Sequence, residues 1–131
     1  MLLRIQSIRI QHEYLLGRLA LAGNHAASVV DRHARKLASF ANPIARVWAQ
    51  VLRAGLAIRA GDNACAEKLI VAVDQAAVAA GMKLTSAVVR FRLAELRGDD
   101  VLLTAAATDM AELGIRVPSK MTALLFPTGT R

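Results

Sequence analysis

The side chains that could do chemistry are few, and their spacing keeps them apart. The sequence holds three histidines, His12, His25 and His33, and one cysteine, Cys65. His12 and Glu13 are adjacent, and adjacent side chains of a helix point about 100° apart, so they are not expected to form an acid–base pair. His25 and His33 are two helical turns apart, too far to share one metal ion without another element between them. We therefore expect no catalytic, cofactor or metal site, and predict that the protein is not an enzyme.

Two other features have structural explanations. Asp99 and Asp100 resemble a metal-binding pair, but acidic residues there also favour the positive end of a helix dipole. A single cysteine excludes an internal disulfide and fits a reducing compartment, so we expect a cytoplasmic protein. Cys65 is predicted to lie early in a helix between two alanines, as a small core residue. A helix N-terminus can also activate a thiol, so a reactive Cys65 is the alternative.

Composition favours one all-α domain over residues 1–131. Hydrophobic residues make up 55% of the 131 residues and aromatic residues 4%, which suits close helix packing better than strands. No stretch approaches 18 uncharged apolar residues, so no membrane span is expected.

The positive charge is concentrated in the first part of the chain. The net charge is +7, and residues 1–60 carry nine Arg or Lys against two acidic residues. Such a segment could bind nucleic acid or an anionic surface, or simply expose solvated helix faces. Nucleic acid is not the expected partner, because no aromatic residues for base stacking lie between the basic ones.

A two-residue motif, Gly followed by Asn or Asp, occurs three times at nearly constant spacing. It stands at Gly23-Asn24, Gly61-Asp62 and Gly98-Asp99, with intervals of 38 and 37 residues between the glycines. The Gly can take the left-handed conformation that closes one helix, and the Asn or Asp can cap the next. The repeat therefore predicts three stacked antiparallel helical hairpins, with about six helices.

The predicted hairpins cover residues of about 2–40, 43–81 and 83–114. A short C-terminal capping turn follows over 118–126, with Ser119 as its N-cap, and it is expected to shield the end of the array. Residues 126–131 are expected to fray. In the first helix, an apolar stripe is expected to face the core, made of Ile5, Ile8, Tyr14 or Leu15, and Leu19.

With this period in view, the chain resembles the tetratricopeptide-repeat family, abbreviated TPR. Ala54 and Ala66 match the small residues that the family places late in its first helix and in its second helix. The resemblance implies a TPR-like α-solenoid whose first helices line a concave groove. In the family's register, groove positions fall at Trp48, Val51, Gly55, Ile58, Arg59, Val88, Arg92 and Glu95.

A second resemblance is local. Residues 52–62, 111–116 and 121–127 look like the C-terminal tail of large bacterial signalling proteins, which join a serine/threonine kinase or an ATPase module to TPR-like repeats. The resemblance implies that the partner could be a domain of the same parent polypeptide. No kinase or Walker motif occurs in this sequence, so that chemistry does not carry over.

These observations predict a non-catalytic scaffold for protein–protein interaction or autoregulation, binding a protein or peptide. The alternative is nucleic-acid or anionic-surface binding through the first 60 residues, and self-association is a third option. Trp48 and its apolar neighbours could instead belong to the core. In that case the exposed candidates are Arg46, Gln50, Arg53 and Arg92. The full set of candidate partner-binding residues is Arg46, Trp48, Gln50, Arg53, Arg92 and Glu95.

Overall fold

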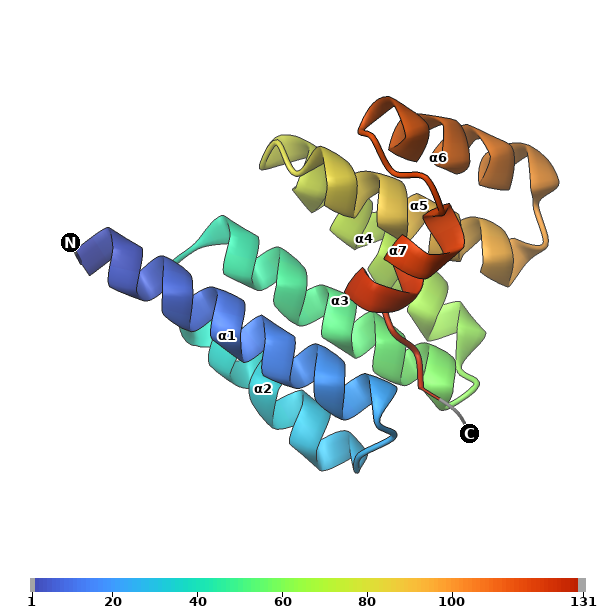
Figure 1. Cartoon of the computed structure of the whole chain (residues 1–131). Coiled ribbons are helices and arrows are strands. Elements are labelled where there is room, and N and C mark those ends of the chain that lie inside the picture. Colours follow the sequence, from blue (N-terminus) through green and yellow to red (C-terminus); the bar gives the residue numbers. More distant parts are fainter. Residues whose placement is uncertain (1, 130–131) are drawn as a thin grey trace.

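The computed structural model describes residues 2–129, and this part of the chain is all-α, as predicted (Figure 1). It contains seven helices and no strand. Short connections join the first six helices, and each of them runs antiparallel to the next (Figure 1). The helices are α1 (Leu2–Ala22), α2 (Ala27–Ser39), α3 (Pro43–Arg59), α4 (Asn63–Ala79), α5 (Lys83–Arg97), α6 (Asp100–Glu112) and α7 (Pro118–Leu125).

Two of the three Gly junctions form as predicted. Gly61 and Gly98 have φ angles of 79° and 62°, in the left-handed region that favours glycine. The Asp62 carboxylate then accepts a hydrogen bond from the backbone N–H of Cys65 at 3.2 Å, and Asp99 accepts one from Leu102 at 3.0 Å. These bonds satisfy backbone donors that the first turn of a helix otherwise leaves free.

The first junction differs from the prediction. Asn24, rather than Gly23, takes the left-handed conformation, with φ of 58°. The N-cap of α2 is Ala26, whose side chain makes no capping bond. The assignment of Asn24 as the cap is therefore wrong, because the connection is longer here and Asn24, which tolerates this region, is used for the turn itself.

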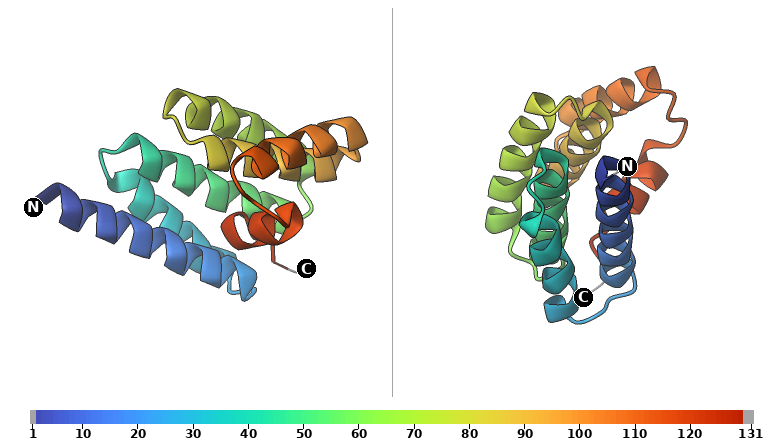
Figure 2. Two further views of the ribbon diagram at one scale, coloured as in Figure 1. Left: turned by 45° about the horizontal axis from the view of Figure 1, so that its top comes forward. Right: turned by 90° about the vertical axis from the view of Figure 1, so that its left-hand side faces the viewer.

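Successive helices pack side by side from α1 and α2 at one end of the molecule to α5 and α6 at the other (Figures 1 and 2). α1 also packs against α3. The small residues Ala54 and Ala66 are fully buried, which lets the helix backbones approach closely. The largest fully buried aliphatic side chains come from most of the helices and form one core: Leu21, Leu37, Leu52, Ile70 and Met110.

α1 turns a different face inward from the predicted one. Ile5, Ile8 and Leu19 are 49%, 65% and 58% exposed, so the prediction that this stripe faces the core is wrong. Of the two alternatives within the stripe, Tyr14 is buried and Leu15 is 41% exposed; Tyr14 and Leu21 lie on the side of the helix opposite Ile5 and form the buried side. α1 has apolar residues at helical spacing on both sides, and the contact with α2 and α3 selects one of them.

The C-terminal turn does not shield the end of the array. α7 packs mainly against α5 and is hydrogen-bonded to α1. Ser119 lies inside α7, whose N-cap is Val117, so the predicted Ser119 cap is wrong. Phe126 and Pro127 are buried, which contradicts the predicted fraying of residues 126–129; residues 130–131 lie outside the described part.

A buried carboxylate joins α1 to α2. The Glu13 side chain is buried and lies 2.5 Å from Nδ1 of His33 and 3.4 Å from Nζ of Lys36. Burial alone raises the pKa of this carboxyl, but the hydrogen bond from His33 and the positive charge of Lys36 outweigh that cost. The pKa of Glu13 therefore lies below its ordinary value, and the charged form stabilises the contact between the two helices.

We expect Glu13→Gln to lower the free energy of unfolding at pH 7 by about 1–2 kcal/mol, because a charge-assisted bond is lost. A lowered pKa stabilises the fold above the unfolded-state value near 4.5, and this contribution is lost as pH falls through the folded-state value. The variant should therefore lose less stability than the wild type between pH 5 and pH 3. Urea denaturation followed by circular dichroism measures both quantities, with the exposed Glu112→Gln as control. If the free energy of unfolding fell equally in Glu13→Gln and in the wild type between pH 5 and pH 3, this role of Glu13 would be contradicted.

Candidate functional site

The chain's own C-terminal segment, residues 118–129, lies across one face of the molecule. We call this face, formed by the sides of α1, α3 and α5 that meet the segment, the inner face. Figures 1 and 2 show α7 beside these three helices and not beyond α6. Leu125 lines a small cavity together with Tyr14 of α1, Trp48 of α3 and Val88 of α5. The segment therefore bridges helices of all three predicted hairpins.

The end of α7 is held to α1 through its backbone carbonyl groups. The hydroxyl of Tyr14 donates a hydrogen bond of 2.5 Å to the carbonyl of Leu125. The Arg18 guanidinium donates one of 3.1 Å to the carbonyl of Leu124, and it also stacks over the Tyr14 ring at 4.6 Å. A helix leaves its last carbonyl groups without partners inside the helix. These two side chains supply the missing donors.

Arg92 of α5 holds the next carbonyl group. Its Nε and one terminal nitrogen lie 2.9 Å and 2.7 Å from the carbonyl oxygen of Phe126. The Phe126 side chain is fully buried, with the same guanidinium 5.7 Å from its ring centroid. Glu95 accepts a 3.0 Å bond from Arg92. A cation at the C-terminal end of a helix is favoured by the helix dipole, so Arg92 contributes both a donor and a charge.

An aromatic pair positions the Tyr14 side chain, which holds the end of α7. The rings of Tyr14 and Trp48 are stacked, with centroids 4.5 Å apart and planes 8° apart. Such pairs contribute about 0.5–1.5 kcal/mol beyond their buried area. Because Tyr14 donates to the carbonyl of Leu125, the stack also fixes the donor that holds the segment.

Beyond the aromatic pair, the segment approaches the backbone of α3 closely. A Cβ atom added at Gly55 would lie 2.6 Å from the carbonyl oxygen of Pro127. A side chain at this position would therefore push Pro127 away. Farther along, a Cβ atom at Gly129 would lie 2.9 Å from Cδ of Arg59. Both Gly55 and Arg59 stand at positions that the family register places in the groove.

The structure divides the predicted candidate residues between two sides of the fold. Trp48, Arg92 and Glu95 lie at the inner face, around the C-terminal segment. Arg53 points toward α2, where it lies 3.8 Å from Asp31. Arg46 and Gln50 precede Arg53 by seven and three residues, on the same side of α3 and away from Trp48. The six residues are therefore not brought together as one site.

Sequence reasoning missed Tyr14 and Arg18 as functional residues. Tyr14 was predicted only as an alternative to Leu15 in the apolar stripe, and Arg18 only as part of the positive charge of residues 1–60. Their spacing of four residues, which places them on one helix face, was the available signal. It did not reveal the carbonyl groups that they bind, which lie more than 100 residues away in the sequence.

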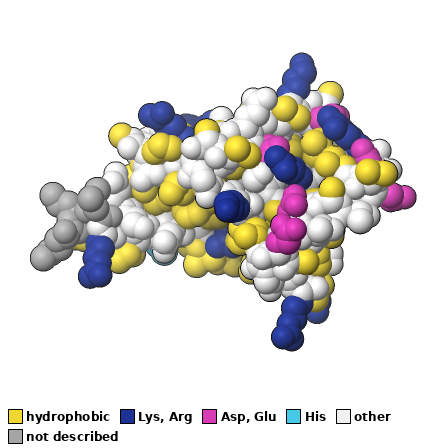
Figure 3. Space-filling view, turned by 90° about the horizontal axis from the view of Figure 1, so that it is seen from above, with side chains coloured by type: hydrophobic (Ala, Val, Ile, Leu, Met, Phe, Trp, Pro, Cys, Tyr) yellow, Lys and Arg dark blue, Asp and Glu magenta, His cyan; other side chains and the backbone are white. Residues whose placement is uncertain are grey.

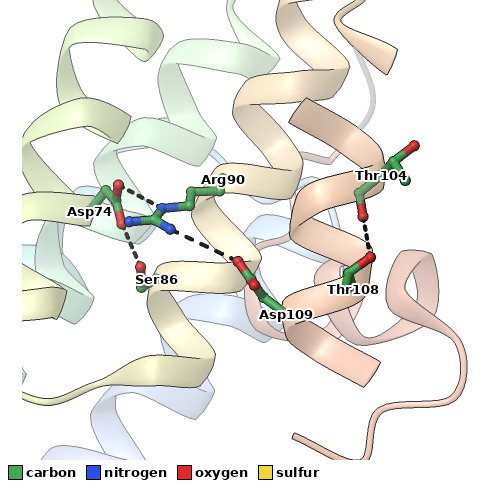
Figure 4. A network of polar contacts seen from close by, with 6 residues as sticks. All are labelled: Asp74, Ser86, Arg90, Thr104, Thr108 and Asp109. Atoms are coloured by element: carbon green, nitrogen blue, oxygen red, sulfur yellow. Dashed lines mark hydrogen bonds and ion pairs between the residues drawn. The ribbon is translucent and has the colours of Figure 1, made fainter. Parts of the chain in front are cut away.

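A second polar cluster lies on another part of the surface, between α4, α5 and α6 (Figure 4). Asp74 accepts hydrogen bonds from Ser86 at 2.5 Å and from Arg90 at 2.9 Å. Arg90 also lies 3.9 Å from Asp109. The cluster ties three helices together. It contains no histidine that could activate the serine as a nucleophile, so we assign it a structural role.

The other chemical candidates remain separate. Cys65 is exposed in the first turn of α4, so the prediction that it is a core residue is wrong. His33 is bonded to Glu13, and His12 and His25 are exposed. Within residues 2–129, no group of three His, Cys, Asp or Glu side chains is placed to hold a metal ion. The described helices also include none with the length and apolarity needed to cross a membrane.

Comparison of the chain with protein-family models, curated proteins and solved structures found no match. Functional inference therefore depends on the inner face and on the segment that covers it.

Tyr14, the chain's single tyrosine, provides a direct probe of this site. Burial raises the pKa of its hydroxyl above the ordinary value of 10.0, and the Arg18 charge opposes this only in part. A raised pKa means that the stabilisation is complete below pH 10 and is lost as pH rises toward the folded-state value. We expect no tyrosinate absorbance near pH 10.5 while the fold persists, and its appearance together with loss of helical circular dichroism at higher pH.

The matched control for this titration is Tyr14→Phe. Its free energy of unfolding at pH 7 should be about 1 kcal/mol lower than that of the wild type, because the hydrogen bond to Leu125 is lost. It should then lose less stability than the wild type above pH 10. Titration of Tyr14 near pH 10 in a protein with intact helical signal would contradict its burial against Leu125.

Proposed function

We propose that this protein is a non-catalytic scaffold for protein–protein interaction, in which the inner face binds the C-terminal end of an apolar helical segment. The observation that carries the proposal is the occupancy of this face by residues 118–129. Side chains from α1 and α5 donate hydrogen bonds to three successive carbonyl groups, those of Leu124, Leu125 and Phe126. Donors aimed at backbone carbonyls, beside a buried apolar pocket, are the features expected of a peptide-binding surface.

The chemistry of this face suggests which segments it would accept. Its donors bind backbone groups, which any helix end presents. Selectivity would come from the buried pocket that holds Phe126 and from the close approach of Pro127 to Gly55. A partner would therefore carry a large apolar residue just beyond the last turn of a helix, followed by an extended chain.

The resident segment also suggests autoregulation. An external partner could bind the inner face only where residues 118–129 have moved away, so the apparent affinity would be reduced by the occupied fraction. The resemblance to tails of bacterial signalling proteins supports a regulatory role, with the partner as a second domain of the same polypeptide. We further propose a cytoplasmic location, on the evidence of the single cysteine.

Nucleic-acid or anionic-surface binding remains the alternative, and no specific observation favours it. Several arginines make ion pairs, among them Arg35 and Arg53 with Asp31 and Arg97 with Glu67. On the face drawn in Figure 3, the Lys and Arg side chains are scattered among other groups. Binding to DNA that weakens steeply with salt would support this alternative.

We test the proposal with the full chain carrying a protease site inserted after Arg116, in the exposed connection that precedes α7. The protein folds intact and is then cut, so that the fragment beginning at Val117 is held only by non-covalent contacts. A fluorescent peptide with the sequence of this fragment should exchange into the cut protein and bind saturably. Trp48, the only tryptophan, should report the exchange by its fluorescence.

The peptide also supplies matched variants. Phe126→Ala in the peptide should weaken binding by more than about tenfold, because a fully buried aromatic is removed. Leu124→Ala should change binding less than about threefold, because that side chain is 60% exposed and its carbonyl group is retained. Failure of the peptide to exchange, or unfolding on cleavage, would make residues 118–129 a permanent part of the fold and overturn the proposal.

A further inference from the structure

α1 carries an apolar stripe on its exposed side, which borders the C-terminal segment at Leu125. Ile5 and Ile8 are 49% and 65% exposed, and Leu15 and Leu19 are 41% and 58% exposed. His12, also exposed, stands between the two pairs. These five positions alternate in steps of three and four residues, which is the spacing of a helix face that packs along another helix.

The charge beside this stripe is positive. Arg4 and Arg9 are exposed, Arg18 is held at the Leu124 carbonyl, and the one acidic residue of α1, Glu13, is buried against α2. Two copies that met stripe to stripe would therefore place arginines beside arginines. Like charges across a contact are unfavourable, so the stripe calls for an acidic helix as its partner.

The opposite end of the same molecule presents such a helix. α6 contains Asp100, Asp109 and Glu112 and no Lys or Arg. Asp109 lies toward Arg90 of α5, while Asp100 and Glu112 are exposed. Its outward side is made of small and medium residues, with Val101 83% exposed and Thr104, Ala105, Thr108 and Ala111 also exposed. Figure 1 places α1 and α6 at opposite ends of the row of helices, and the acidic atoms visible in Figure 3 lie away from the N-terminal end.

We propose that copies of this chain associate head to tail, with the α1 stripe of one copy packed against the outer side of α6 of the next. Large side chains on α1 would fit between small ones on α6, with arginines beside carboxylates. The contact would extend, between molecules, the helix-against-helix packing that α2 and α3, or α4 and α5, make within one chain. Because the two surfaces differ, a dimer still carries one free surface of each kind, and the association can continue beyond the dimer.

Sedimentation velocity over a range of concentrations tests this directly. We expect the mass of the wild type to rise with concentration beyond that of a dimer at low salt, and association to weaken in 0.5 M salt. Ile8→Glu and Val101→Arg should each lower the association constant by about tenfold or more, because each also adds a repulsive charge. Val78→Glu, at a position 58% exposed on α4, is the matched control and should associate as the wild type does.

A mixture of the two blocked variants makes the test specific. Each variant keeps one working surface, so an equimolar mixture of Ile8→Glu and Val101→Arg should form dimers and nothing larger. A wild type that stays monomeric at all concentrations would overturn the proposal. So would full association of Val101→Arg, which would mean that α1 packs against itself or another surface. Ile8 lines a surface hollow together with Leu125 of the C-terminal segment. Val101→Arg, at a position on α6 that is 83% exposed, is therefore the variant that separates this proposal from that of the inner face.

Discussion

The arrangement of the molecule depends on how the last carbonyl groups of α7 are satisfied. An eight-residue helix is too short to be stable alone, and its C-terminal carbonyls need donors from elsewhere. Tyr14, Arg18 and Arg92 supply them, from helices at opposite ends of the row. The contact therefore orders α7 and at the same time links the first and third hairpins. Buried donors and acceptors stabilise a fold only as complete sets, because an unpaired member costs about 1–3 kcal/mol.

This contact also explains why the inner face suggests a binding surface. Tyr14 and Arg92 are positioned by partners other than the segment itself, through the stack on Trp48 and the bond to Glu95. Donors that keep their geometry without the segment would be ready for another helix end, which is the preorganisation that favours binding. Autoregulation follows if the resident segment and an external partner compete for the same donors.

The sequence predicted the parts of this fold that local chemistry determines. Gly61 with Asp62, and Gly98 with Asp99, mark helix ends because left-handed glycine and a capping carboxylate act within a few residues. The orientation of α1 could not be predicted in this way. Apolar residues stand at helical spacing on both sides of this helix, with Ile5 and Leu19 on one of them, and either side could have faced the core. Which side of α1 is buried depends on how Leu21 and Tyr14 fit against α3. That fit is a contact between residues distant in the sequence.

The site itself was predicted only in part. The register of the groove pointed to Trp48 and Arg92, both of which meet the C-terminal segment. The short helix over residues 118–126 was expected, but its place on the inner face was missed. Residues 126–131 were expected to fray, because Pro127 and Gly129 give this stretch the composition of a loose tail. Arg92, which donates to the carbonyl of Phe126, lies 34 residues away in the sequence, and no local pattern reveals such a contact.

Nuclear Overhauser measurements on the intact protein test the central claim most directly. If the C-terminal segment occupies the inner face, the Phe126 ring protons should show cross-peaks to the Arg92 side chain, with chemical shifts displaced from random-coil values. Sharp Phe126 signals at random-coil positions, without cross-peaks to α5, would contradict the account.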